Sequence, residues 1–332
     1  MSTLAPKGLS WVTVRQFRRT LWTAAALVLL ALAGTVALRV WEARTPGRRA
    51  VHGDLLDDGL AYDLLRLTME SGAMYLLLLV LVTGAFVAGP LVAREFETGT
   101  YRLSLTQSLT PAAWLRAKVL TAGAVSTVLT LALMGVFHIG WSRVSGTYNL
   151  AWGDRGPYES GGVVLLAYVI ASVGIGTLIG LLVRRTLLAM AATGLVMGVV
   201  LLVLGAVRWS FLPVLTVTGP TGSALVPPAD ILQTDMGLTT RSGGRMAEWA
   251  CSGQAADAVP EDSGTMSDAA WNNAWNKAYD SCLTEHGVTG QYLDYHPYSH
   301  YWPTQLIESG ILLALAGLAL FAAFRVLRAR LP

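Results

Sequence analysis

A polar stretch between two long apolar segments has the clearest functional pattern in the chain. It covers residues 94–120 and reads REFETGTYRLSLTQSLTPAAWLRAKVL. Glu95 and Glu97 open it, and carboxylates favour the first turn of a helix. Thr110 followed by Pro111 predicts the cap and first turn of a second helix. Apolar side chains within this stretch predict a surface that docks another protein; they are Leu103, Leu105, Leu109, Trp114 and Leu115.

Other residues are of the types found in metal and hydrolase sites, but their spacing does not fit such sites. His296 and His300 lie four residues apart near Asp294, but Pro297 between the histidines disfavours a regular helix, and no third ligand is fixed by spacing. We therefore expect no metal site. The chain has no G-x-S-x-G or H-E-x-x-H motif, so nothing supports an intramembrane hydrolase.

Two ionisable residues fall near the ends of predicted spans. Glu308 lies about one turn inside the last span, where it would face water or Arg208. His138 lies near the outer end of the third span, where we favour packing over a substrate or proton role.

Membrane spans are the elements that must position these residues. The chain is 53% hydrophobic and 14% charged, with a mean hydropathy of +0.50, which excludes an ordinary soluble enzyme and a disordered chain. The net charge of +3 gives no basic field for nucleic acid. About 20 apolar residues cross a bilayer. Six stretches reach that length: 21–40, 73–93, 119–141, 163–183, 187–207 and 305–327.

The distribution of charge predicts the orientation. More than half of the basic residues lie in short segments on one side, and the positive-inside rule makes that side cytoplasmic, together with both termini. Residues 1–20 are expected to form a cytoplasmic amphipathic elbow, and residues 21–207 the first five spans, including a loop at 94–118. Residues 208–304 would form an extracellular domain, followed by the sixth span and the cytoplasmic C-terminus in residues 305–332.

The three outer segments differ in content. The leucines among acids in residues 41–72 predict an amphipathic helix on the membrane surface. Residues 142–162 read as a short connector. Residues 208–304 are long enough for a small folded domain, which we expect to be mostly helical. The predicted fold class is thus an all-α polytopic membrane protein with six transmembrane helices and this domain between the fifth and sixth.

A helix and a disulfide are predicted within the extracellular domain. Ser267 or Asp268 would cap a helix that stops at Gly287. Its one aromatic face ends in a cysteine and consists of Trp271, Trp275, Tyr279 and Cys282. The other cysteine, Cys251, follows Met246 and Trp249 in a second short helical piece. Both cysteines lie on the oxidising side, which favours a disulfide over two free thiols.

The polar stretch resembles the first cytoplasmic loop of ABC-2 type transporter permeases. That loop has an acid pair, Gly-Thr, apolar residues, a Thr and a short helix that ends in Lys. The matching positions are Glu95, Glu97, Gly99, Thr100, Leu103, Leu105, Thr106, Trp114, Leu115 and Lys118. The family usually has Pro after that Thr, where this chain has Gln107. The six-span layout is similar too, whereas the enlarged outer domain looks like an elaboration seen in actinobacterial members.

The resemblance implies the permease subunit of an exporter in the bacterial plasma membrane. Its cargo would be a hydrophobic or amphipathic compound, a lipid-linked molecule or a drug, and no residue identifies it further. The chain would not be an enzyme and would bind no cofactor, since it has no G-x-x-x-x-G-K-[ST] motif. Two copies of a separate ATP-binding subunit would hydrolyse ATP with Mg. A second permease chain, identical or different, would complete the pathway.

The resemblance also implies a role for the segment from Glu95 to Trp114, namely ATPase coupling. Its carboxylates would pair with basic residues of the ATPase, and the coupling residues would be Glu95, Glu97, Gly99, Thr100, Arg102, Thr106 and Trp114. One alternative is that the acids only cap a helix and neutralise Arg94 and Arg102. Another is a membrane sensor whose extracellular domain binds a ligand. A secondary transporter is less favoured, because inverted repeats and midplane charges are not evident.

Overall fold

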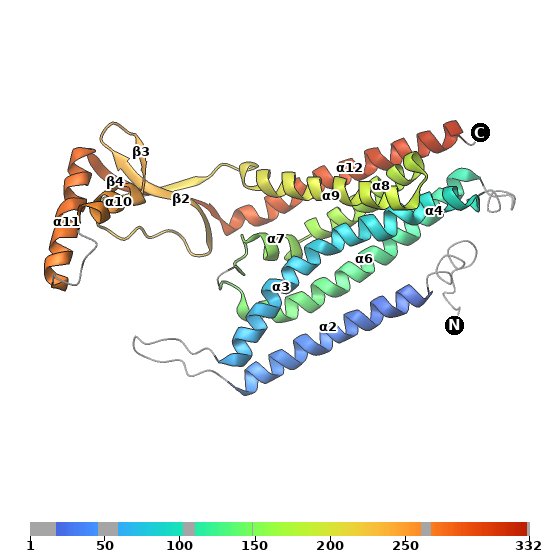
Figure 1. Ribbon diagram of the computed structural model, residues 1–332, viewed down its shortest axis with the longest axis horizontal. Coiled ribbons are helices and arrows are strands. Elements are labelled where there is room, and N and C mark those ends of the chain that lie inside the picture. The colour runs from blue at the N-terminus through green and yellow to red at the C-terminus, as the bar shows by residue number, and fades with distance from the viewer. Residues whose placement is uncertain (1–17, 46–58, 102–109, 148, 260–266, 331–332) are drawn as a thin grey trace. The chain divides into compact units, whose positions relative to one another are not determined.

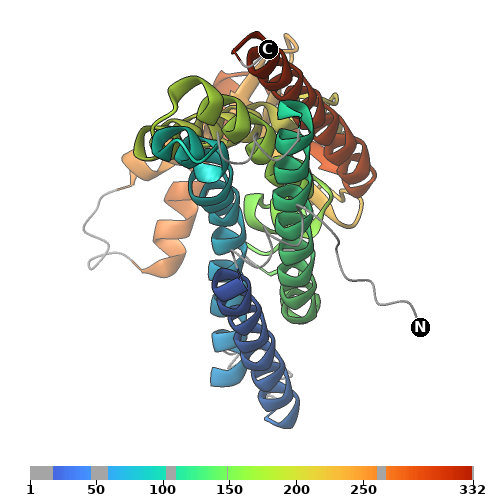
Figure 2. The ribbon, with the colours of Figure 1, turned by 90° about the vertical axis from the view of Figure 1, so that its right-hand side faces the viewer.

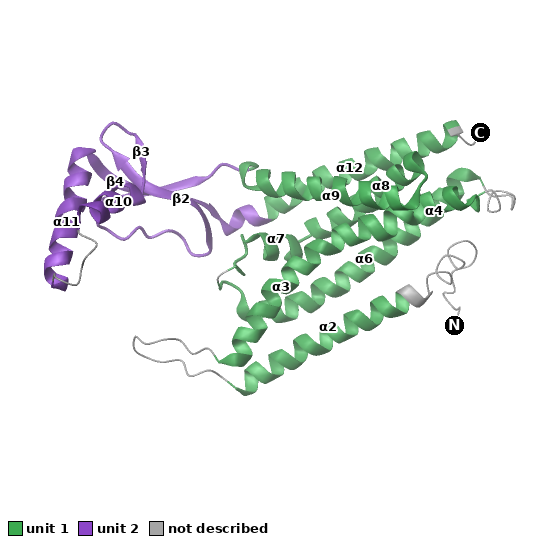
Figure 3. Cartoon of the chain, viewed as in Figure 1, with its two compact units in different colours: residues 1–211, 302–332 green, residues 212–301 purple. Residues whose placement is uncertain are grey.

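The protein is described by a computed structural model for residues 18–45, 59–101, 110–147, 149–259 and 267–330. Six of the described helices are long and apolar enough to cross a membrane, which confirms the predicted number of spans. They cover Leu21–Arg44, Leu60–Thr98, Pro111–Val144, Val164–Val183, Thr186–Ser210 and Tyr298–Ala329. The predicted amphipathic elbow falls outside the described residues except for its last three positions. The chain forms two compact units, which Figure 3 distinguishes: unit 1 is Met1–Phe211 with Trp302–Pro332, and unit 2 is Leu212–Tyr301.

Unit 1 is a bundle of helices. They are α2 (Arg18–Arg44), α3 (Leu60–Val82), α4 (Gly89–Thr98), α6 (Pro111–Val144), α7 (Arg155–Gly161), α8 (Val164–Val183), α9 (Thr186–Val207) and α12 (Tyr301–Arg330). Figures 1 and 2 show α2 at one edge, where it packs on α3 and α6. α8 is the most enclosed span, because it contacts α3, α4, α6, α7 and α9.

α3 and α4 are parts of one long helix. The π-helix η1 (Thr83–Ala88) joins them without a break. The amphipathic run expected to lie separately on the membrane surface instead forms the first turns of α3 from Leu60 onwards, while residues 46–58 lie outside the described part. The physical reason is that buried Leu65 and Met69 continue the apolar face of the span at helical spacing.

Small residues bring this long helix close to α8. A Cβ atom added at Gly176 would lie 2.5 Å from the Ala88 side chain, and one at Gly180 would lie 2.9 Å from the backbone oxygen of Gly89. Only glycine fits at both places, so the backbones of η1 and α4 contact α8 directly. This contact fixes how α4 lies against α8 within the bundle.

Unit 2 combines a sheet with two helices. The four antiparallel strands have the order β1-β4-β2-β3 and cover Leu215–Gly219 (β1), Ile231–Thr240 (β2), Arg245–Ala247 (β3) and Val288–Pro297 (β4). α10 (Trp249–Ala258) and α11 (Asp268–Glu285) supply two cysteines to a small core with Leu238. Ser267 caps α11 as predicted, by accepting a hydrogen bond from the Ala270 amide at 3.3 Å.

The expectation that this domain is mostly helical was wrong. Its central strands, β2 and β4, are ten residues each and contain four Thr and two Tyr residues between them, which suit a pleated, half-buried surface. The aromatic helix has the stronger periodic pattern in the sequence. The strands were not predicted, because register shifts at Gln233/Asp235 and Thr239/Thr240 break the alternation of inward and outward side chains along β2. Met246, expected in a helical piece with Cys251, lies in β3.

Candidate functional site

The predicted coupling loop is mostly helix where the structure describes it. α4 extends to Thr98 and ends because Gly99 adopts the left-handed conformation, with φ 73°. α6 begins at Pro111, and its predicted cap is confirmed: the Thr110 hydroxyl accepts a hydrogen bond from the Ala113 amide at 3.2 Å. We call the end of α4 and the beginning of α6 the α4–α6 junction.

Glu95 connects the two sides of the α4–α6 junction. Its carboxylate accepts a hydrogen bond from Trp114 Nε1 at 3.2 Å and forms an ion pair with the Lys118 ammonium. Glu95 and Glu97 were expected in the first turn of a helix, but they lie in the last turns of α4, because the span continues through them. Glu95 therefore joins two helices instead of capping one.

Aromatic rings pack together beside Trp114, the donor to this carboxylate. The ring of Phe96 lies 4.7 Å from that of Tyr101 and meets Trp114 edge-on at 6.2 Å, measured between centroids. The Arg184 guanidinium lies 5.3 Å from the centroid of Phe96. Trp114 also belongs to a core cluster with Leu181 of α8 and Leu327 of α12. The ends of α4, α6, α8 and α12 thus meet at the junction, as Figure 1 shows.

Trp114 and Leu115 face the interior of unit 1. Only 2% of Trp114 is exposed, and Leu115 is fully buried, so neither side chain forms part of an exposed apolar surface. The other predicted anchors, Leu103, Leu105 and Leu109, lie outside the described residues. Trp114 could not be assigned to the interior from sequence because its partners come from distant helices.

We expect Trp114→Ala to destabilise unit 1 by about 3–5 kcal/mol, because it removes a buried aromatic ring and a donor to Glu95. Thermal unfolding of the purified chain in detergent measures this effect. Trp22→Ala is the matched control, since Trp22 is 67% exposed on α2. Equal unfolding temperatures for the two variants would contradict the packing role of Trp114.

Glu97 binds a different helix from Glu95. Its carboxylate accepts a hydrogen bond from the backbone amide of Thr186 at 2.8 Å, at the first residue of α9. A carboxylate there satisfies an unpaired amide and complements the helix dipole. Glu97 is otherwise exposed. Glu97 thus caps α9, whereas the alternative considered for the acids was that they cap their own helix and neutralise Arg94 and Arg102.

The remaining predicted coupling residues lie at the turn after α4. The hydroxyls of Thr98 and Thr100 are 2.9 Å apart, and Thr98 also donates to the carbonyl of Arg94 at 2.8 Å. Thr100 is exposed beside Gly99. Arg102 and Thr106 lie outside the described residues.

A second polar site is buried near the other ends of α8, α9 and α12. Arg208, 1% exposed, binds Glu308 through Nε at 2.8 Å and binds Glu159 through Nη2 at 2.5 Å. Glu308 also accepts a hydrogen bond from the Tyr168 hydroxyl at 2.7 Å. Both carboxylates are fully buried. We call these four residues the ion cluster.

Neighbouring residues of unit 1 hold the ion cluster in place. The Arg208 guanidinium lies 4.1 Å from the centroid of the Tyr158 ring, and Arg155 approaches Glu159 at 3.4 Å. Gln305 donates to the Tyr158 carbonyl at 2.7 Å and accepts from the Val164 amide at 3.0 Å. These bonds connect α7, α8 and α12, so the ion cluster lies within a rigid network.

The ion cluster was predicted only in part. Glu308 was expected to face water or Arg208, and the structure shows the contact with Arg208. Glu159 was missed, because residues 142–162 read as a connector. That reading was wrong: the segment contains α7, whose residues 157–160 are buried. His138 is exposed on α6, with its ring 5.9 Å from Trp141.

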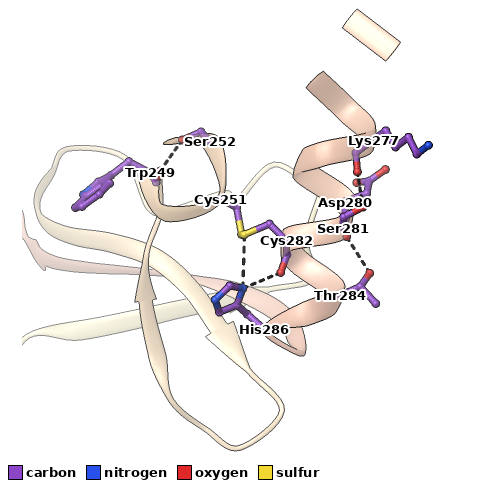
Figure 4. Close-up of a disulfide and its surroundings, with 9 residues drawn as sticks. All are labelled: Trp249, Cys251, Ser252, Lys277, Asp280, Ser281, Cys282, Thr284 and His286. Carbon is purple, nitrogen blue, oxygen red and sulfur yellow. Dashed lines mark hydrogen bonds between the residues drawn. A yellow bond between two sulfur atoms is a disulfide. The ribbon is translucent and has the colours of Figure 1, made fainter. Parts of the chain in front are cut away.

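The predicted disulfide is present in unit 2. Cys251 of α10 and Cys282 of α11 are bonded, and Figure 4 shows His286 beside them. The His286 Nδ1 atom lies 3.0 Å from the carbonyl oxygen and 3.6 Å from the sulfur of Cys282. Although the two sulfurs and this ring could resemble a metal site, the disulfide leaves no thiolate to bind an ion. The site is therefore structural.

His296, in β4, and His300, three residues after the strand ends, contact each other. Their Nδ1 atoms are 3.0 Å apart. The adjacent carboxylate of Asp294 is engaged elsewhere. It accepts a hydrogen bond from the Thr216 hydroxyl at 2.5 Å and pairs with Arg245 at 2.6 Å. Burial opposes ionisation of Asp294, but these two partners outweigh it and hold its pKa below the usual value.

This pKa shift gives unit 2 a defined pH dependence. The stabilisation is fully present above the unfolded-state pKa of Asp294, about 3.9, and is lost as the pH falls through the lower folded-state pKa. Hydrogen exchange of peptides from β1 and β4 measures it. At neutral pH Asp294→Asn should exchange faster than the wild type, and the difference should disappear in acid. The exposed Asp257→Asn control should show no difference at any pH.

The spanning helices define a multi-pass membrane protein. A family model described as ABC-2 membrane transporter related matches residues 23–208, more than half of the chain. The chain therefore belongs to the ABC-2 membrane transporter related family, which typically supplies permease components without a catalytic domain. The match ends before unit 2. No match is found among curated proteins or solved structures.

Proposed function

We propose that the chain is the permease subunit of an ABC-2 type exporter, with the α4–α6 junction facing the cytoplasm. Family membership supports this function. The single structural observation that carries it is the binding of Glu95 to Trp114 and Lys118, because this contact makes α4 and α6 move as one body.

The proposed orientation is consistent with the charges at the junction. Arg94 of α4 and Arg116 of α6 lie on helices that meet there, and Arg184 directly follows α8. The positive-inside rule assigns such an end to the cytoplasm. Both termini are then cytoplasmic and unit 2 is extracellular. An extracellular position also suits the disulfide of unit 2, since such bonds persist in oxidising compartments.

The proposed partners are two copies of an ATP-binding subunit and a second permease chain. The exposed face of the junction, formed by Arg94, Glu97 and Thr100, would contact the ATPase, while Glu95 and Trp114 would hold that face in shape. Closure of the ATPases would then tilt α4 and α6 together, as packed helices do in hinge and shear motions. The cargo is a hydrophobic or amphipathic compound moved outward.

The test is affinity purification from native membranes with mass spectrometry and an ATPase assay. We expect a stoichiometric ATP-binding subunit to co-purify, and Glu97→Lys to abolish ATPase stimulation at unchanged expression. Glu97→Gln separates the roles of the acid: it keeps an acceptor for the Thr186 amide but removes the charge. Full stimulation in both variants would reject the coupling role of Glu97, and absence of any ATPase would favour the sensor.

A further inference from the structure

The ion cluster holds more buried negative charge than buried positive charge. Glu159 and Glu308 are fully buried, and Arg208 is the buried cation that they share. A second cation, Arg155, approaches Glu159 at 3.4 Å but is half exposed. A buried charge without a full counter-charge is costly in a medium of low dielectric constant. One of the two acids can relieve this imbalance by taking up a proton.

The two acids differ in how their oxygens are bonded. Both oxygens of Glu308 accept hydrogen bonds: Oε2 from Arg208 Nε at 2.8 Å, and Oε1 from Arg208 Nη2 at 3.0 Å and from the Tyr168 hydroxyl at 2.7 Å. The contacts of Glu159 with Arg208 and Arg155 instead reach one oxygen, Oε1. Its Oε2 atom is buried and has no hydrogen-bond donor among the described residues. Oε2 of Glu159 is therefore the oxygen of the ion cluster whose charge is least compensated.

Further charged and titratable side chains lie on the helices that pack against α7. They include Arg66 and Glu70 of α3, His138 and Arg143 of α6, Tyr168 of α8, and Asp154 and Tyr158 next to Glu159 in sequence. Two of these charges are engaged elsewhere: Glu70 accepts a hydrogen bond from Asn149 at 2.7 Å, and Arg143 pairs with Glu42 at 2.7 Å. The ionisation of Glu159 therefore depends mainly on the ion cluster and Arg155.

Burial raises the pKa of Glu159, and this effect outweighs the opposing attraction of Arg208 and Arg155. The negative charge of Glu308 acts in the same direction as burial. Glu159 lies in α7, one helical turn from Arg155, whose half-exposed guanidinium brings solvent close to the carboxyl group.

We propose that the ion cluster is a proton-binding site, in which Oε2 of Glu159 takes up one proton from the aqueous phase and Arg208 keeps Glu308 as its charged partner. The proton comes from hydronium in the solvent and forms an O–H bond on Oε2, and no covalent bond within the chain breaks. The buried charges of the ion cluster then balance. Proton binding therefore stabilises the packed position of α7, because Glu159 binds the proton more tightly there than in water.

Hydrogen exchange measures this stabilisation. It is fully present below the unfolded-state pKa of Glu159, about 4.3, and is lost as the pH rises through the higher folded-state pKa. Glu159→Gln has nearly the same shape as the protonated acid. At neutral pH we expect peptides covering residues 150–162 to exchange more slowly in Glu159→Gln than in the wild-type full chain, and the difference to disappear in acid. Glu285→Gln, exposed on α11, is the control and should match the wild type.

Infrared difference spectroscopy detects the proton itself. In a pH titration of the full chain in detergent, the carbonyl stretch of a protonated carboxyl group should appear at a pH at which ordinary Glu side chains, with a pKa of about 4.3, are still ionised. We expect this band to be lost in Glu159→Gln and kept in Glu285→Gln. In Glu308→Gln it should appear only at lower pH, because Arg208 then neutralises Glu159 alone.

Three results would overturn the proposal. They are equal exchange of residues 150–162 in the wild type and Glu159→Gln at every pH, faster exchange in Glu159→Gln at neutral pH, and an infrared band that persists in Glu159→Gln. The last result would assign the proton to another acid, such as Glu308. The proposal does not rest on the proposed transport function, because both measurements are made without an ATPase.

Discussion

Arg208→Met should destabilise unit 1 by about 3–5 kcal/mol, because it leaves two buried carboxylates without their shared cation. Glu159 and Glu308 would then lose the pairing that compensates for their burial. Thermal unfolding in detergent measures the effect. Arg155→Gln is the control, since Arg155 is half exposed and its contact with Glu159 is worth no more than about 1 kcal/mol.

Removing all three charges distinguishes pairing from packing. Adding Glu159→Gln and Glu308→Gln to Arg208→Met should restore most of the lost stability, because neutral side chains no longer need a counter-charge. If the triple variant is as unstable as Arg208→Met, the volume of the arginine stabilises the bundle and its charge does not.

Loss of the disulfide should destabilise unit 2 by about 3–4 kcal/mol, from the loop-closure entropy of its 31-residue separation. Cys251→Ser with Cys282→Ser is the appropriate variant, because it leaves no free thiol. Limited proteolysis of the full chain in increasing urea measures the change. The double variant should be cleaved within unit 2 at lower urea than the wild type.

The same digestion tests the bond directly. Wild-type fragments cut between the two cysteines should stay joined on a non-reducing gel and separate after reduction. Ser252→Ala, next to Cys251, is the control variant and should behave as the wild type. Two thiols that titrate in the unreduced native chain would contradict the disulfide.

Local signals in the sequence predicted part of the fold. The six spans follow from hydropathy, because a helix in lipid must be apolar over its whole length. Thr110 and Ser267 were identified as caps from short patterns, and both hydroxyls accept the expected amide. The cysteine pairing followed from there being only two cysteines. Each of these features depends on residues that are neighbours in the sequence or on the number of cysteines.

Several features that depend on distant residues were missed. Glu159 binds a residue 49 positions away, and no periodicity marks α7 as a helix that carries a buried acid. Glu95 likewise bonds across 19 positions to Trp114. The sheet of unit 2 pairs β1 with β4, far apart in sequence, and its edge strand β1 is mostly exposed. Each of these three features depends on tertiary contacts that no local sequence pattern indicates.

The π-helix η1 sets the angular phase between α3 and α4. An α-helix advances about 100° per residue, whereas i to i+5 bonding accommodates one extra residue in a turn. The faces of the long helix before and after η1 are therefore offset around its axis. Rewinding η1 as α-helix at the same length would rotate α4 by about 100° relative to α3. Glu95 would then point away from Trp114, although every residue of both helices would be unchanged.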